Sequence, residues 1–92
     1  MKAQNTHPFN VGANMLIQTV THYYAGKLVA VTPGELVLEN AAWVADTGRF
    51  TPAVASGDFS EVEMFPAGVK VIIGRGALVA AVEIVKLPTT QK

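Results

Sequence analysis

A Gly-Arg-Gly sequence interrupts the hydrophobic stretch VIIGRGALVAAV (residues 71–82), an arrangement that could form a phosphate-binding loop. In dinucleotide-binding units, glycines let backbone N–H groups approach a pyrophosphate at the N-terminus of a helix. Such a unit also needs a second parallel strand and an acidic residue about 20 residues later. Only sixteen residues follow Gly76, and they include Pro88. A helix over residues 77–87 would favour the nucleotide interpretation.

The competing interpretation is a tight turn between two antiparallel strands. Residues 69–73 (VKVII) and 78–85 (LVAAVEIV) are rich in the β-branched residues that strands favour. Glycine within residues 74–77 would supply the positive φ angle that a hairpin turn needs. We therefore expect a hairpin here and no bound nucleotide or other cofactor.

The other residues that could do chemistry are scattered along the chain. The two histidines, His7 and His22, have no spacing that suits a metal site. Ser56 and Ser60 are outside any G-x-S-x-G motif. The acidic residues around positions 46–63 are expected to solvate a loop rather than act as acid–base catalysts. We therefore predict no enzyme activity, no metal site and no small-molecule substrate.

The composition points to one small domain that contacts a partner. A chain of 92 residues forms a single domain. Half of its residues are hydrophobic and 15% are charged, so part of its apolar surface is expected to face another protein. Seven basic residues balance seven acidic ones, which leaves no positive field to attract nucleic acid or anionic lipid. The absence of cysteine excludes disulfides and thiolate metal sites.

The N-terminal sequence lacks the apolar core of a signal peptide, and no stretch approaches the roughly 18 apolar residues of a membrane span. We expect no membrane partner and an intracellular location. The first eight residues are polar and end at His7-Pro8, which predicts an extended arm.

Short apolar runs broken by glycine and proline predict an all-β protein. Gly26 is expected to separate the first two strands, and Pro33-Gly34 to form a turn before the third. The expected strands in this half are residues 15–24 (MLIQTVTHYY), 27–31 (KLVAV), 35–39 (ELVLE) and 41–46 (AAWVAD).

The amino-acid composition changes at residues 47–66, and this segment is interpreted as an insertion that contains one short helix. Thr51 is expected to cap this helix and Gly57 to end it, with an extended segment at residues 61–65 (EVEMF). The fold class predicted for the single domain, residues 1–92, is a small, strongly bent barrel of five or six strands.

Two segments together resemble the signature of the Sm-like family, which has a small SH3-type β-barrel. GKLVAVTPGELVLENA (26–41) is similar to its first half and VIIGRGALVAAV (71–82) to its second. The resemblance implies a bent five-stranded sheet whose open edges pair between subunits to form rings. It also implies single-stranded RNA at the inner rim, read by an Asp, an Asn and an Arg.

Only the arginine of that RNA-binding set is present, as Arg75. Thr32 falls at the Asp position, and the Asn position falls near Glu35. The candidate RNA-binding residues of an Sm-like ring are therefore Arg75, Tyr24 and Lys27. The loss of two base-reading residues and the gain of a carboxylate lead us to expect no nucleic-acid partner.

The segments TVTHYYAGKLVAV and ENAAWVADTGRF are similar to small proteins of unassigned role from tailed phages. This similarity favours a virion or assembly component, which oligomerises or joins other virion proteins through its edge strands. The candidate edges are residues 15–24 and 78–85, which carry one charged residue, Glu83. The candidate interface residues are Val79, Val82, Tyr23, Trp43 and Phe50. The alternative function is an Sm-like RNA-binding ring.

Overall fold

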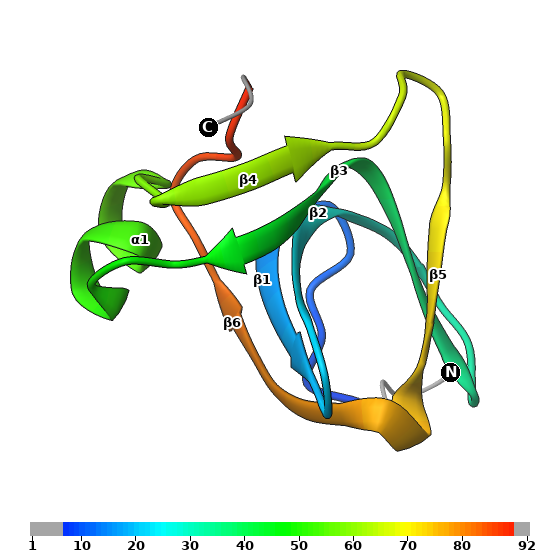
Figure 1. Ribbon diagram of the computed structural model, residues 1–92. Helices are drawn as coiled ribbons and strands as arrows, with labels where there is room; N and C mark the ends of the chain where they lie inside the picture. Colours follow the sequence, from blue (N-terminus) through cyan, green and yellow to red (C-terminus); the bar gives the residue numbers. More distant parts are fainter. Residues whose placement is uncertain (1–6, 90–92) are drawn as a thin grey trace.

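The computed structural model describes residues 7–89, which form a curled antiparallel sheet with one short α-helix beside it (Figure 1). The sheet order is β4-β3-β2-β1-β6, and β5 also pairs with β3. The elements are β1 (Asn14–Thr19), β2 (Tyr23–Val31), β3 (Glu35–Asp46), α1 (Phe50–Ser56), β4 (Glu61–Met64), β5 (Val71–Gly74), a 3₁₀ turn η1 (Arg75–Ala77) and β6 (Leu78–Glu83).

The prediction of a β protein with one short helix is confirmed, but closure into a barrel is not. Within residues 7–89, β6 pairs only with β1, while β4 and β5 pair only with β3. The sheet therefore curls without a ring of hydrogen bonds. Residues 1–6 of the predicted polar arm lie outside the described residues.

β3 is the strand that holds the sheet together. Its first half, from Glu35 to Leu38, pairs with β5, and its second half, from Ala42 to Asp46, pairs with β4. β2 runs along its other side. The two segments predicted at 35–39 and 41–46 are thus one bent strand, which passes through Asn40 at a φ of 51°.

Buried clusters lie on both faces of the sheet. Successive strand residues point to opposite faces, so neighbours in a strand belong to different clusters. The helix-side cluster lies against α1 and contains Leu16, Ala25, Ala42, Val44, Ala53, Phe59, Val62 and Ile84. The far-side cluster contains Met15, Ile17, Leu28, Leu36, Leu38, Ala41 and Ile73. Tyr23 packs on the helix-side cluster and its neighbour Tyr24 on the far-side cluster.

The single strand predicted over residues 15–24 is wrong, because a turn divides it. Thr19 Oγ1 accepts a hydrogen bond from His22 N at 3.0 Å and donates one to His22 O, also at 3.0 Å. The chain reverses here, and His22 lies in the turn rather than in a strand. β1 then pairs with β2 on one side and β6 on the other, so it is not the free edge that the sequence predicted.

Gly26 lies inside β2 and does not end a strand as predicted. A Cβ at this position would stand 3.0 Å from Leu38 Cβ and 3.2 Å from Ala41 Cβ. Glycine is therefore needed for the close approach of β2 and β3.

The hairpin predicted at residues 74–77 is also wrong. The 3₁₀ turn η1 connects β5, which pairs with β3, to β6, which pairs with β1. Gly74 has a φ of −66°, and Gly76 is not among the residues with positive φ. Because residues 78–83 are a strand, the helix required by the nucleotide interpretation is absent from this segment.

α1 lies within the range predicted for the one short helix and ends at the predicted glycine. It starts after Arg49, which makes no side-chain capping bond, and not after Thr51. Gly57 closes it at a φ of 71°, and its N–H donates to Ala53 O at 2.9 Å. Since β4 belongs to the sheet, residues 47–60 and 65–66 of the predicted insertion lie outside it.

Replacement of Gly57 by alanine is expected to lower the free energy of unfolding by about 1 to 2 kcal/mol, because a Cβ disfavours positive φ. The new Cβ would also meet the Lys86 carbonyl oxygen, so the C-terminal segment would have to shift. Thermal unfolding followed by circular dichroism measures the loss as a lower Tm. Gly74→Ala is the matched control, since its φ is ordinary and its Cβ would meet open space. Equal Tm values for the two variants would contradict this account of Gly57.

Candidate assembly interface

β6 is a free sheet edge and carries little protection. Three valines in or beside it are exposed: Val79 by 59%, Val82 by 36% and Val85 by 73%. Glu83 is the single charged residue of the strand. Soluble proteins usually blunt such edges with charge, proline or a covering segment. The topology confirms the predicted edge over Leu78–Glu83, whereas at the end of the predicted range Val85 N donates to Val54 O of α1 at 3.3 Å.

The register shows which backbone groups of β6 are free. Ile84 N donates to Asn14 O at 2.9 Å, so the N–H and C=O of Ile84 face β1. Orientation alternates along an antiparallel strand, so Ala80 and Val82 also face β1. Ala81 and Glu83 therefore point their N–H and C=O groups away from the sheet, where another strand could pair with them.

A small apolar hollow adjoins this edge on the helix side. It has a volume of about 90 Å³ and is bordered by Tyr23, Phe50 and Val82, which come from β2, α1 and β6. The rings of Tyr23 and Phe50 lie 6.4 Å apart, and Phe50 is 49% exposed. Three of the five candidate interface residues thus meet at one place, with room for a small side chain of a partner.

The other two candidates lie elsewhere. Val79 is on β6, beside the register shift between Gln18 and Thr19. Trp43 lies directly opposite Tyr24 in the β2–β3 register, on the far side of the sheet from Tyr23 and Phe50. Trp43 therefore does not belong to the surface around the hollow.

A second edge is formed by β4 and β5, which the sequence did not single out. On β5 the side chain of Ile72 is 67% exposed. The run VKVII contains only one polar residue, so no alternation in the sequence indicates which of its side chains faces solvent.

The candidate RNA-binding residues do not form a common site. Arg75 Nη1 donates to Thr32 O at 2.6 Å, and its guanidinium carbon lies 5.3 Å from the centre of the Phe9 ring. Tyr24 is half-buried against the far-side cluster, whereas Lys27 is exposed. Within residues 7–89, Arg75, Tyr24 and Lys27 make no hydrogen bond, ion pair or ring contact with one another.

Residues 7–89 contain no cluster of three or more His, Asp or Glu side chains that could hold a metal ion. Over the same range, no helix has the length and apolar character needed to cross a membrane. Comparisons with protein-family models, with curated proteins and with solved structures gave no match. We therefore infer the function from the geometry of the chain itself.

Proposed function

We propose that this protein is a non-enzymatic assembly module that joins copies of itself, or a larger complex, by strand addition at β6. The observation that carries the proposal is the free apolar edge, with the outward N–H and C=O groups of Ala81 and Glu83. An added strand would pair with these groups, and side-chain pockets beside the strand would supply specificity.

The hollow beside β6 supports the same surface. An incoming strand would cover Val79 and Val82, and one of its side chains could fill the space against Phe50. Burial of apolar surface contributes roughly 25 cal/mol per Å², so exposed valine and phenylalanine side chains favour association. Aromatic residues at the centre of such a surface are frequent hot spots.

The second free edge suggests how more than two copies could assemble. Pairing of β6 with the β5 edge of another copy is a heterologous contact, which produces a closed ring or an open filament. The Sm-like resemblance implies a ring and an SH3-type barrel. It is supported by the contact between the two motif halves, in which Arg75 N donates to Gly34 O at 2.8 Å. The similarity to tailed-phage proteins favours a virion as the place of assembly.

The test is a lysine at position 82. Val82→Lys is expected to raise the dissociation constant of self-association at least roughly tenfold, because a charge at the contact must be desolvated on pairing. Sedimentation velocity measures the assembly state, and far-UV circular dichroism shows whether the fold is retained. Val11→Lys is the matched control, since Val11 is 55% exposed and lies outside β6. A wild-type protein that stays monomeric at high concentration, alone and with extracts of its source, would refute the proposal.

The alternative function, an Sm-like ring that binds single-stranded RNA, has one observation in its favour. The turn at Thr32–Glu35 lies against Arg75, so the two segments that would form the RNA site are adjacent. Against it, Arg75 is held by a backbone carbonyl and the Phe9 ring, and Glu35 adds a negative charge to the same turn. We therefore favour the assembly module.

A further inference from the structure

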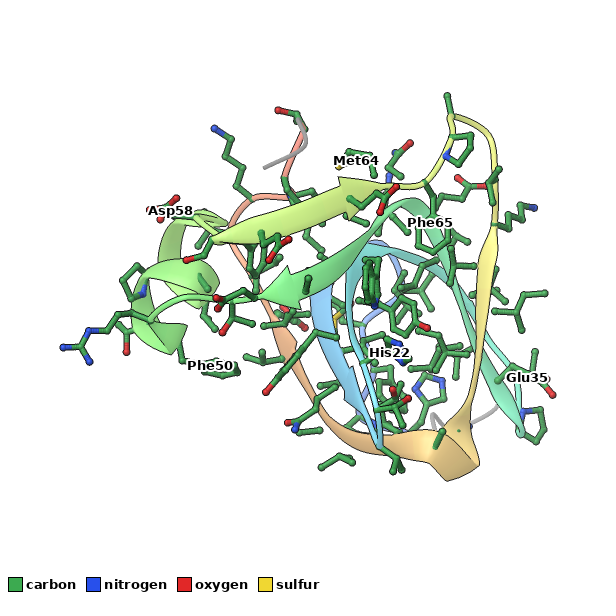
Figure 2. The ribbon with its side chains drawn as sticks, viewed as in Figure 1. His22, Glu35, Phe50, Asp58, Met64 and Phe65 are labelled. Carbon is green, nitrogen blue, oxygen red and sulfur yellow. The ribbon has the colours of Figure 1, made fainter. Side chains whose placement is uncertain are left out.

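Four rings gather in a groove on the face of the sheet away from α1. They are His22, Tyr24, Trp43 and Phe65, and the carboxylate of Glu63 stands beside them. The groove has a volume of about 380 Å³, which lies within the range of pockets that hold small organic ligands. Figure 2 shows Phe65 at the end of β4 and His22 within the outline of the curled sheet.

The register of three strands builds this groove. Tyr24 of β2 lies opposite Trp43 of β3, which lies opposite Glu63 of β4, so the three side chains form a row across one face. Phe65 follows β4 and is held by a hydrogen bond of 3.0 Å from its N–H to Ala41 O. His22 enters from the β1–β2 turn, where its Nδ1 lies 2.6 Å from Thr21 Oγ1.

The His22 ring is inclined to the rings of Trp43 and Tyr24, whereas the Tyr24 and Phe65 rings are closer to parallel, with 24° between their planes. The centre of the His22 ring lies 5.6 Å from that of Trp43, with an angle of 52° between the planes, and 6.1 Å from that of Tyr24, with an angle of 44°. The Tyr24 and Phe65 rings lie 6.4 Å apart. Rings at different inclinations can contact a rounded group from more than one side.

The charge of the groove favours a cation. Aromatic faces carry negative potential and attract cations within about 6 Å of the ring centre. Glu63 is exposed and makes no hydrogen bond or ion pair within residues 7–89. No lysine or arginine lines the groove. A phosphate would therefore be repelled, which separates this groove from a base-stacking surface for RNA.

We propose that the groove binds an organic cation whose nitrogen carries alkyl groups, as in choline or trimethyl-lysine. A bare ammonium is strongly hydrated and would need acceptors for each N–H, whereas four of the seven residues that line the groove carry aromatic rings. An alkylated nitrogen has no N–H to satisfy, keeps its charge and presents methyl groups to the rings. Glu63 then neutralises the charge at the rim.

The cation groove and the assembly interface are independent. Trp43 and Tyr24 face away from the helix-side cluster, whereas Tyr23 and Phe50 border the hollow beside β6. Failure of one proposal therefore leaves the other standing. Val82→Lys is expected to bind the cation as the wild type does.

Trp43 makes a direct test possible, because it is the only tryptophan of the chain. Choline is titrated while Trp43 fluorescence is followed, and 3,3-dimethylbutan-1-ol serves as the neutral probe of the same shape. We expect choline to bind about tenfold more tightly than the neutral alcohol, the difference that cation–π attraction provides. Addition of salt is expected to weaken choline binding through screening of the Glu63 charge.

Two glutamates of β4 provide matched variants. Glu63→Gln is expected to weaken choline binding about threefold, the scale of a partly exposed ionic contact. Glu61→Gln removes the same charge from the same strand, but Glu61 lies opposite Asp46 and outside the groove, so binding should not change. Equal binding of choline and the alcohol, or equal effects of the two variants, would overturn the proposal. A fluorescence response to single-stranded RNA without one to choline would overturn it in favour of base stacking.

The source of the cation is then found with two further probes. A trimethyl-lysine peptide and phosphatidylcholine vesicles present the same alkylated nitrogen on a protein and on a membrane. Tighter binding to one of them than to choline assigns that source and supports the proposal. If the protein binds choline but binds both the peptide and the vesicles more weakly, the natural ligand is a free small cation.

Discussion

Replacement of Phe59 by alanine is expected to lower the free energy of unfolding by about 3 to 5 kcal/mol, the usual cost of truncating a buried phenylalanine. Phe59 is 1% exposed and lies in the helix-side cluster, between the end of α1 and the start of β4. Its loss would leave a cavity where Ala53 and Val62 now pack. A domain of this size has a total stability of roughly 5 to 14 kcal/mol, so the variant should unfold at a much lower urea concentration.

Phe50→Ala is the matched control for this prediction. Phe50 is 49% exposed, so its removal should lower the stability by less than about 1 kcal/mol. The same variant is expected to weaken self-association, because Phe50 borders the hollow beside β6. Equal urea midpoints for the two variants would mean that the packing around Phe59 is not as described.

Replacement of Arg75 by alanine is expected to lower the free energy of unfolding by about 2 to 4 kcal/mol, since hydrogen bonds from charged groups contribute about 1.5 to 3 kcal/mol and a cation–π contact about 0.5 to 1. The variant loses the bond to Thr32 O and the contact with the Phe9 ring, which tie η1 to the β2–β3 turn and the N-terminal segment. Denaturant unfolding measures the change.

Lys70→Ala provides the comparison for loss of a basic side chain. Lys70 Nζ lies 3.9 Å from Glu39 Oε2 in an exposed ion pair, which is expected to contribute less than about 0.5 kcal/mol. RNA binding is measured on the same proteins. We expect none by the wild type at about 150 mM salt, because few phosphate contacts are possible. Micromolar RNA binding by the wild type that Arg75→Ala abolishes would favour the Sm-like ring.

Local signals in the sequence predicted the class of fold and several element boundaries. Leu36 and Leu38 alternate with polar or less buried residues, and both are fully buried in β3. Gly57 ends α1 because a helix C-terminus commonly needs a residue with positive φ. Such features depend on a few adjacent residues, so they can be read without knowledge of strand pairing.

The turns and the strand order could not be predicted from local sequence signals. Val20, Thr21 and His22 belong to an apolar, β-branched run, yet they form a turn because Thr19 bonds His22. In the sequence, Gly26 and Gly74 both suggest the end of a strand. In the structure, Gly26 is needed for the close approach of two strands, and Gly74 has ordinary extended geometry. The role of a glycine depends on what approaches it from another strand.

The sequence by itself determined that the chain is a β protein with one short helix, an apolar C-terminal strand and no excess of positive charge. Only the tertiary structure decided that β1 is interior, that β6 is the free edge, and that Phe50, Tyr23 and Val82 border one hollow. It also brought Tyr24, Trp43 and Glu63 into one row. The physical reason is that edge position and cross-strand neighbours depend on the register between segments far apart in the chain, which residue types and local spacing do not specify.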